Sequence, residues 1–402
     1  MLFNPDKKPF PRRPDTGPMV AKTLYGLEEL LAAELSALGA AEINLGKRAV
    51  SFSGDRRLLY KANLRCRLAT RILVPIREFH AATAGELYHH VSQVHWSRYL
   101  DLNKTFAVDA VTHFSEFNNS MFVAQKVKDA VVDWFRRQSG QRPNVDPITP
   151  DVRLHIHLRG KKATLALDAS GEPLSHRGYR LEGGEAPVNE VLAAGIITLS
   201  GWDCLSPFVD GMCGSGTLAI EAALMARNIA PGLLRKEFAF MRWPDFNRRL
   251  WQEVFEEARQ AASPTAPAHI FAIDIEPARV REALANARRA GVTADLSIAA
   301  ADFAAFDPPP GPGVLVVNPP YGERLMPGPI GELYKRIGDT FKSKYEGYKA
   351  HILTGNIPAI KQIGLRSSRR ITLYNGPLEC RLLVYDMYKG SRRTPPDGKI
   401  GE

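Results

Sequence analysis

The stretch Gly313-Val314-Leu315-Val316-Val317-Asn318-Pro319-Pro320-Tyr321 decides the fold that we expect for this chain. Its first five residues are apolar, which is typical of a strand buried on both faces of a parallel sheet. The strand ends at two prolines, whose rings fix φ and push the preceding residue into an extended conformation. Asn318 is therefore predicted to lie at the carboxyl end of a strand, the edge at which open α/β sheets bind ligands.

The tetrapeptide Asn318–Tyr321 has the chemistry of a pocket for an amino group. The amide oxygen of Asn318 and the carbonyls of the two prolines accept hydrogen bonds, and neither proline has a backbone donor. Such a pocket could hold the amine of a planar ring, and Tyr321 offers a face on which that ring can stack. Taken alone, the tetrapeptide fits a strand-ending turn equally well. Its catalytic interpretation therefore depends on the rest of the chain.

A second motif, Asp210-Gly211-Met212-Cys213-Gly214-Ser215-Gly216-Thr217, joins a predicted strand to an apolar helix. Its glycines let the backbone approach a ligand at the N-terminus of the helix. A glycine loop alone is compatible with NAD, FAD, nucleoside phosphates and S-adenosylmethionine. The glycines do not have the GxGxxG spacing and the chain lacks GxxxxGK[ST], which weakens the dinucleotide and P-loop interpretations.

Two acids at predicted strand ends narrow the choice of ligand for the glycine loop. Asp274 ends the second strand, where a carboxylate can accept hydrogen bonds from both hydroxyls of a ribose. Asp302 and Phe303 follow the third strand, where they could hydrogen-bond and flank an adenine, although Asp302 alone could equally be a helix cap. The glycine loop, the two acids and the tetrapeptide, in this order, support one another far more strongly than any one of them does alone.

Composition indicates the class of protein and its partner. The chain has 402 residues, 45% of them hydrophobic, enough for two or three domains with ordinary cores. The net charge of +10 predicts a polyanionic partner, although a solvated basic surface would look the same. The four cysteines form no CxxC pair, so we expect no zinc or other metal site, no disulfides and a cytoplasmic protein. No apolar stretch approaches the roughly 20 residues that cross a bilayer, so we expect no membrane contact.

The front half is predicted to be α+β. Residues 1–18 form a basic, proline-rich leader that we expect to be disordered. Residues 19–76 show the pattern of strands with two helices, and residues 77–170 that of the order α-α-β-α-β-β. Thr83 is a candidate N-cap in the second of these segments. Basic faces on its long helix and on its alternating strand match contact with nucleic-acid phosphates.

The back half is predicted to hold a mostly parallel sheet. Residues 171–185 are polar and glycine-rich, which indicates a linker. From 186 to 390, helix and strand patterns alternate, and Asn375-Gly376 predicts an antiparallel hairpin at the edge of the sheet. An aromatic-rich insertion, residues 231–262, separates the first and second strands. Residues 391–402 form a tail that we expect to be disordered.

With these motifs in place, the chain resembles a known family. The glycine loop and the Asn-Pro-Pro-Tyr motif resemble the cofactor and catalytic motifs of class I S-adenosylmethionine-dependent methyltransferases acting on amino nitrogens. The front half resembles the THUMP RNA-binding module with its usual ferredoxin-like domain. Together the matches are typical of the RlmL-type bacterial rRNA guanine-N2 methyltransferases. The remaining stretches that carry the resemblance are Phe117–Ser120, Gln125–Ala130, Arg177–Arg180, Glu185–Pro187, Asn318–Leu325, Leu373–Gly376 and Glu379–Leu382.

The resemblance implies a Rossmann-like class I methyltransferase domain, with a seven-stranded, mostly parallel sheet, preceded by ferredoxin-like and THUMP α+β domains. It implies S-adenosyl-L-methionine as cofactor and 23S rRNA, or an assembling large ribosomal subunit, as the partner of a monomeric enzyme. The implied catalytic residues are Asn318, Pro319, Pro320 and Tyr321. The implied cofactor-binding residues are Pro187, Asp210, Gly211, Cys213, Gly214, Gly216, Thr217, Asp274, Ile275, Asp302, Phe303 and Asn318. The implied RNA-binding residues are Asn118, Asn119, Lys126, Lys128, Arg177 and Arg180.

Two departures from the family are visible. Gly211 stands where the family usually has proline, which should loosen the loop without removing a ligand. The sequence ends at Glu402, so we expect it to lack the second methyltransferase domain of some relatives.

Other functions share parts of this pattern. DNA adenine and protein glutamine methyltransferases could use the same tetrapeptide, but the former need a target-reading domain and the latter carry no THUMP module. A tRNA guanine-N2 methyltransferase has the same architecture and is the closest alternative. A non-catalytic RNA-binding ribosome assembly factor is the alternative outside the enzymes, and the intact motifs argue against it.

Overall fold

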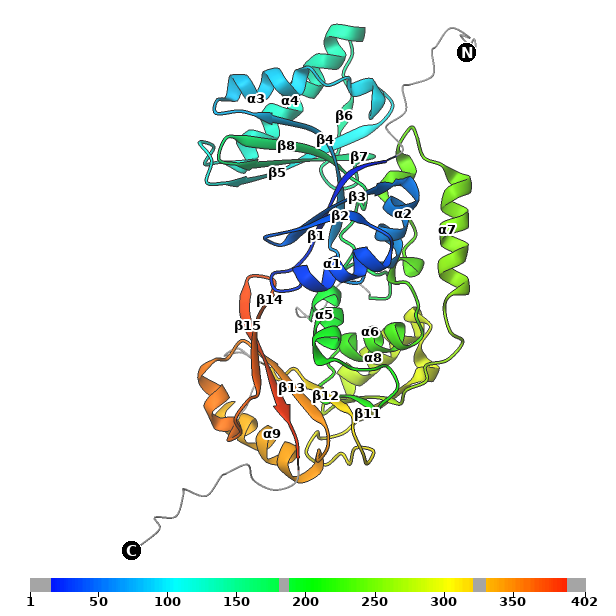
Figure 1. Ribbon diagram of the computed structural model, residues 1–402, viewed down its shortest axis with the longest axis vertical. Coiled ribbons are helices and arrows are strands. Elements are labelled where there is room, and N and C mark those ends of the chain that lie inside the picture. Colours follow the sequence, from blue (N-terminus) through cyan, green and yellow to red (C-terminus); the bar gives the residue numbers. More distant parts are fainter. Residues whose placement is uncertain (1–15, 181–187, 321–329, 389–402) are drawn as a thin grey trace, which may run out of the picture. The chain divides into compact units, whose positions relative to one another are not determined.

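The computed structural model describes residues 16–180, 188–320 and 330–388, which belong to two compact units (Figure 1). The first unit consists of Met1–Arg180 and Asn228–Ala262, and the second of Leu181–Arg227 and Ser263–Glu402. The chain therefore passes from one unit to the other three times, after residues 180, 227 and 262.

An eight-stranded sheet forms the first unit, in the order β2-β3-β1-β4-β8-β7-β5-β6. β4 joins its two halves, because it is antiparallel to β1 through Arg71–Leu73 and antiparallel to β8 along most of its length. The predicted boundary after Ile76 lies inside this shared strand. The strands are β1 (Thr16–Lys22), β2 (Ala41–Gly46), β3 (Ala49–Asp55), β4 (Arg71–His80), β5 (Thr105–His113), β6 (Asn144–Val145), β7 (Val152–Arg159) and β8 (Lys162–Asp168).

Side-chain caps start several helices of the first unit. The Thr83 side chain accepts a hydrogen bond from the backbone N–H of Glu86, whose side chain caps in return, so the predicted N-cap of α3 (Ala84–Ser92) is confirmed. The Asn119 side chain caps α4 (Ser120–Ser139) by accepting hydrogen bonds from the backbone N–H groups of Met121 and Phe122. The two helices pack against each other and over the sheet at β4 and β5. α1 (Glu28–Ala37) and α2 (Arg56–Arg65) belong to the other half.

The aromatic-rich insertion belongs to the first unit, although it interrupts the sequence of the second. It contains the short helices η2 (Pro231–Leu234) and η3 (Ala239–Arg242) and the helix α7 (Arg248–Gln260), which lies along α2 (Figure 1). Tyr60 of α2 stacks on Phe240, with ring centroids 4.6 Å apart, and Arg57 pairs with Glu253 at 3.3 Å. Burial of these aromatic rings favours the docked position, because each large ring removed from water contributes about 1.5–3 kcal/mol.

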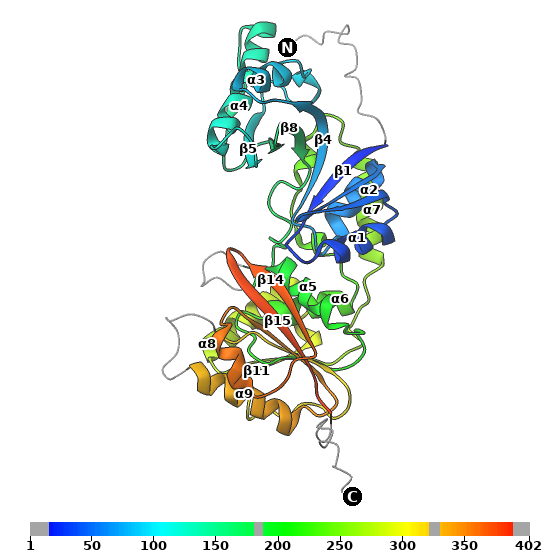
Figure 2. The ribbon, with the colours of Figure 1, turned by 60° about the vertical axis from the view of Figure 1, so that its left-hand side comes forward.

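A seven-stranded sheet forms the second unit, in the order β11-β10-β9-β12-β13-β15-β14. The first five strands are parallel, and β15 and β14 form the predicted antiparallel hairpin at the edge (Figure 2). The seven-stranded, mostly parallel sheet expected from the sequence is confirmed. The strands are β9 (Phe208–Asp210), β10 (Ile270–Asp274), β11 (Leu296–Ala300), β12 (Val314–Val317), β13 (Lys349–Thr354), β14 (Arg369–Asn375) and β15 (Leu378–Asp386).

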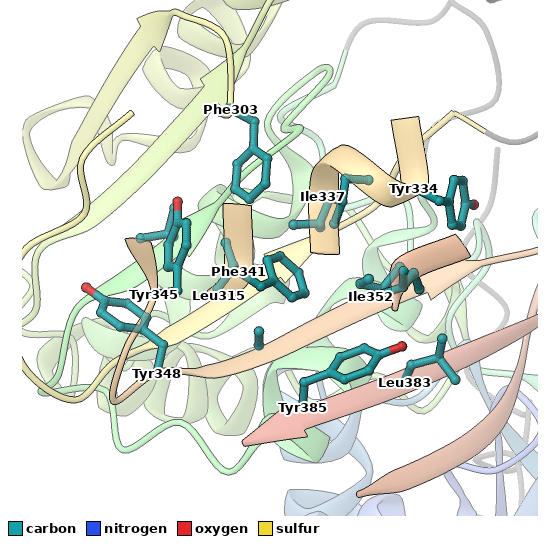
Figure 3. Close-up of a cluster of buried hydrophobic side chains, with 14 of the residues drawn as sticks. Phe303, Leu315, Tyr334, Ile337, Phe341, Tyr345, Tyr348, Ile352, Leu383 and Tyr385 are labelled. Atoms are coloured by element: carbon teal, nitrogen blue, oxygen red, sulfur yellow. The ribbon is translucent and has the colours of Figure 1, made fainter. Parts of the chain in front are cut away.

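Helices cover both faces of this sheet. α5 (Glu190–Ser200), α6 (Thr217–Ala226) and α8 (Pro277–Ala290) lie on one face, and α9 (Ile330–Lys344) lies on the other (Figure 1). Figure 3 shows Ile337 and Phe341 of α9 packed over Leu315 of β12, in a core cluster that also contains Phe303. A strand covered on both sides must be apolar throughout, which explains the Val-Leu-Val-Val run of β12. Among the described residues, no helix is both long and apolar enough to cross a membrane.

A buried histidine predicts how the stability of the second unit depends on pH. His351 of β13 is fully buried, and burial lowers its pKa to about 4, against a smaller opposing effect of the Leu315 carbonyl that its Nδ1 contacts at 3.2 Å. Lys349 further lowers this pKa and Asp386 raises it. Below pH 6.5 the unfolded chain binds a proton that the folded chain excludes, so folding stability should fall from pH 6.5 to about pH 4, by up to about 3 kcal/mol.

Chemical denaturation between pH 4 and 7 measures this effect. His351→Gln removes the titrating group. The free energy of unfolding of this variant should therefore change less with pH than that of the wild-type protein. Equal pH dependence of the two proteins would show that His351 is not the group responsible.

Candidate active site

β9 and β12 bring the two motifs of the sequence together. Asp210 ends β9, Asn318 follows β12, and these strands are parallel neighbours in which Asp210 pairs with Val316. The backbone N–H of Gly211 donates to the carbonyl of Val316 at 2.9 Å. The strand order reverses here, with β10 and β11 on one side and β13 on the other. Such a reversal is where open α/β sheets bind ligands, beyond the carboxyl ends of their strands.

Hydrogen bonds to β10 shape the glycine loop. The N–H of Cys213 donates to the carbonyl of Ile273 at 2.8 Å. The two carboxylate oxygens of Asp274 accept hydrogen bonds from the N–H groups of Gly214, at 2.8 Å, and Glu276, at 2.9 Å. Each carboxylate oxygen has a second lone pair. Asp274 can therefore hold the loop and still accept hydrogen bonds from a ribose.

Close packing explains two glycines of this loop. Gly216, the N-cap of α6, has φ +82°, and a Cβ atom there would lie 2.9 Å from the Cβ of Ala283. A Cβ atom at Gly211 would lie 2.8 Å from the ring of Phe303. Gly211 also makes the hydrogen bond to β12 described above, which a proline could not donate. Its backbone is therefore tethered in a way that the usual proline of the family would not allow.

Asp210 is a buried carboxylate facing this loop. Its side chain is fully buried, and neither oxygen has a hydrogen-bond partner of good geometry among the described residues. Burial raises its pKa to about 8, the nearby Ala219 N–H opposes this shift, and the charge of Asp274 adds to it. An unpaired buried carboxylate is costly. A cationic or hydrogen-bond-donating ligand group would stabilise its ionised form.

Asn318 presents a second unsatisfied acceptor at this edge. Its Oδ1 atom is buried and has no hydrogen-bond partner among the described residues. The neighbouring Pro319 is buried and Pro320 is half-buried. Buried amide oxygens are almost always hydrogen-bonded in native proteins, and leaving one unpaired costs about 1–3 kcal/mol. The position of this atom therefore fits a ligand that donates a hydrogen bond.

The remaining cofactor residues differ in their accessibility. Asp302 accepts a hydrogen bond from the N–H of Ala304 at 2.9 Å and pairs with Arg336 of α9. Phe303 is only 5% exposed and lies in the core cluster of Figure 3, so its role as an adenine flank stays a prediction, with little ring surface accessible. Ile275, in contrast, is 66% exposed directly after Asp274.

One predicted RNA contact is wrong. Arg177 is 2% exposed, and its guanidinium donates to the carbonyls of Leu174, at 2.7 Å, and Arg67, at 2.6 Å. A guanidinium buried against backbone carbonyls cannot contact a phosphate, so Arg177 holds the polypeptide after β8 in place. Arg177 was predicted to bind RNA because Arg177–Arg180 resembles a family motif, and burial is not visible in a short sequence motif.

The other predicted RNA contacts lie at the surface or are partly exposed. Asn118 is exposed, and Asn119 is exposed but also caps α4. Lys126 lies over the ring of Phe122, and Lys128 pairs with Asp129 at 3.1 Å. Arg180 is half-buried. Two further predicted site residues, Pro187 and Tyr321, lie outside the described residues.

Two supporting residues were missed from the sequence. Arg336 reaches Asp302 from a helix 34 residues later, and nothing in its local sequence indicates that contact. Asn286 of α8 is 1% exposed and donates to the carbonyl of Ser215 in the glycine loop at 2.9 Å. The sequence pattern could have revealed Asn286, because it is a polar residue on the apolar face of α8, which buries Ala283, Ala287 and Ala290.

The chain matches three known families. Residues 177–383 match the family described as "RMKL-like, methyltransferase domain", residues 81–168 the THUMP domain, and residues 18–73 the RlmL ferredoxin-like domain.

Individual relatives agree with these matches. The "Ribosomal RNA large subunit methyltransferase K/L" of Syntrophotalea carbinolica is 43% identical over 90% of this chain, which spans only 52% of that relative. The protein slr0064 of Synechocystis sp., which carries the name of an RNA methyltransferase, is 36% identical, with 93% of this chain and 97% of the relative covered. The crystal structure of SMU.472 in complex with SAH covers 94% of this chain and 100% of its own, with 32% identity and a TM-score of 0.84.

Strand order, glycine loop and strand-end acids together define a class I S-adenosylmethionine-dependent methyltransferase fold. The buried oxygens of Asp210, which lack partners among the described residues, and the polar face of Asp274 fit this cofactor. More closely, the chain belongs to the RMKL-like methyltransferase family, with the THUMP and RlmL ferredoxin-like domains that its front half was expected to contain.

Proposed function

We propose that the chain is an RNA methyltransferase that uses S-adenosyl-L-methionine to form N2-methylguanosine in 23S rRNA. The observation that carries this proposal is the buried Oδ1 atom of Asn318, which has no hydrogen-bond partner in the described part of the chain and follows a strand next to that of the glycine loop. An exocyclic amine is a hydrogen-bond donor that this atom can accept. The THUMP domain and the rRNA-methyltransferase name of the Syntrophotalea carbinolica relative support RNA as the substrate. We expect the enzyme to act as a monomer in the cytoplasm.

S-adenosylmethionine, when bound, supplies an electrophilic methyl group on a sulfonium. The protein would hold its methionine end with Asp210 and the glycine loop, and its ribose with Asp274. Methyl transfer to nitrogen is an in-line displacement, for which proximity and orientation can supply about 7–11 kcal/mol. These residues therefore act mainly by positioning.

Asn318 would act on the substrate amine, whose lone pair is delocalised into the purine ring. Its Oδ1 atom and the carbonyl of Pro319 would accept hydrogen bonds from the two amine hydrogens and offset the positive charge that develops on nitrogen. Tyr321 would stack on the extruded base, whose removal from its helix costs a few kcal/mol. The excess proton would leave to water after transfer.

Transfer of a labelled methyl group tests the proposal directly. We expect label in rRNA, with much less in tRNA, DNA or protein, and mapping of modified guanines in a strain that lacks the protein should identify the nucleotide. Comparison of naked rRNA with assembling large subunits distinguishes the two possible substrates. Label in tRNA alone, or in DNA alone, would show that this nucleic acid, and not rRNA, is the substrate.

RNA binding by the front half should depend strongly on salt. Basic side chains on α4 and β7, such as Lys126 and Arg159, would contact phosphates without reading sequence, and each phosphate contact releases counterions. We expect the affinity of the full chain for structured RNA to fall steeply between about 50 and 200 mM salt. Filter binding or fluorescence anisotropy at several salt concentrations measures the slope. A slope near zero would contradict phosphate contact.

A further inference from the structure

Phe114 is the most exposed large hydrophobic side chain of the described residues, at 88%. It lies in the loop between β5 and α4 and has φ +48°, in the left-handed region that bulky residues rarely adopt. Both features disfavour phenylalanine, since its apolar ring is exposed to water and its bulk is unfavourable at positive φ. Asparagine, which is polar and tolerates the left-handed region, would suit the position better. Backbone strain and an exposed apolar ring at one residue are typical of a functional contact.

Cationic residues lie beside this ring. His113, the last residue of β5, pairs with Arg159 of β7, and its carbonyl accepts a hydrogen bond from the N–H of Gly160 at 3.0 Å. The turn from Arg159 to Lys162, which we call the basic turn, therefore adjoins Phe114. Arg159, Lys161 and Lys162 are exposed, and only Lys162 has an acidic partner that the structure shows, Glu78 at 2.9 Å.

The start of α4, at the other end of the same loop in the chain, adds apolar surface. Met121 is 70% exposed and Phe122 is 41% exposed, with the Lys126 ammonium 5.7 Å from the Phe122 ring centroid. Glu116 is the one acidic residue of the loop between β5 and α4. Exposed aromatic rings between cations are the arrangement by which proteins hold unpaired nucleotides, with stacked bases and neutralised phosphates.

We propose that Phe114 stacks on an unpaired base of the RNA substrate while the basic turn contacts the adjoining phosphates. This rests on the proposed function, because it takes RNA as the substrate, and it adds that the front half recognises a single-stranded segment. Lysine, which supplies two of the three cations of the basic turn, is depleted at protein–protein interfaces, so an RNA ligand fits this surface better than a protein partner does.

Phe114→Asn in the full chain tests the proposal. Asparagine tolerates the left-handed conformation, so the melting temperature should stay equal or rise, which excludes a folding defect. Affinity for an RNA hairpin with an unpaired loop should fall about 10-fold or more, as expected for loss of one stacked base. Affinity for a fully paired RNA duplex of equal length should not change. Phe114→Trp should retain binding, and Leu205→Asn, at an equally apolar site that is 66% exposed in the other unit, should have no effect.

Three results would overturn the proposal. If Phe114→Asn and the wild-type protein bind the hairpin with equal affinity, Phe114 does not stack on a base. If Phe114→Asn loses the same affinity for the hairpin and for the duplex, the residue contributes to general phosphate contact and not to stacking. Weakened binding to ribosomal particles with unchanged hairpin affinity would assign Phe114 to a protein contact instead. Labelled methyl transfer by the original chain is measured in parallel, so a failure of the proposed function is seen separately, as absence of RNA methylation.

Discussion

Asn318→Ala is expected to slow single-turnover methyl transfer by about 10²–10³-fold while cofactor and RNA affinities stay nearly unchanged. The Oδ1 atom of Asn318 is buried and has no hydrogen-bond partner among the described residues, so removing it breaks no hydrogen bond to them. Its interaction with the amine should strengthen as positive charge develops on nitrogen. Loss of such an interaction raises the barrier and leaves ground-state binding largely intact.

Tyr321 provides the contrasting variant. Stacking holds the base before the reaction, so Tyr321→Ala should weaken productive RNA binding by about 1–3 kcal/mol, and Tyr321→Phe should keep much of the activity. Single-turnover rates, with cofactor and RNA binding measured separately, distinguish the two residues. Near-normal turnover of Asn318→Ala would mean that the tetrapeptide is only a strand-ending turn.

Asp274→Ala is expected to weaken S-adenosylmethionine binding by more free energy than one hydrogen bond contributes. The carboxylate would hold the ribose, and it also accepts hydrogen bonds from the N–H groups of Gly214 and Glu276. A hydrogen bond to a charged group contributes about 1.5–3 kcal/mol, and the variant removes three or four contacts at one site. We expect at least a 100-fold loss of affinity by calorimetry. Asp274→Asn, whose amide oxygen still accepts, should lose less.

Asp203→Ala is the matched control for this variant. Asp203 also accepts hydrogen bonds from two backbone N–H groups, of Leu205 and Ser206, but it does so in an exposed loop before β9. Its loss should leave cofactor affinity unchanged. Unchanged affinity in a folded Asp274→Ala variant would exclude Asp274 from the cofactor site.

The short motifs predicted much of the second unit because their information is local. Alternation of helix and strand predicted the parallel sheet, and Asn375-Gly376 predicted the hairpin of β14 and β15. Glycine spacing and strand-end acids predicted a loop that, in the structure, follows β9 and is hydrogen-bonded to Asp274 at the end of β10. Each of these features depends on residues that are neighbours in sequence, so no knowledge of the packing was needed.

Burial and long-range contacts required the tertiary structure. Arg177 was predicted from the resemblance to bind RNA, yet it is buried and hydrogen-bonded to backbone carbonyls. The insertion seemed part of the methyltransferase half, yet Tyr60 and Phe240 fix it to the other unit. β6, with two residues, is too short for any periodic signal.

The sequence by itself determined the class of sheet, the position of its ligand edge and the chemistry of the residues there. These follow from hydrophobic period, from proline and glycine geometry and from the order of the motifs along the chain. Only the tertiary structure decided which polar atoms at that edge lack hydrogen-bond partners among the described residues, those of Asp210 and Asn318, and which aromatic ring of the first unit is most exposed, that of Phe114. Partner atoms and solvent access are set by the packing of segments distant in sequence, and a local pattern carries no record of them.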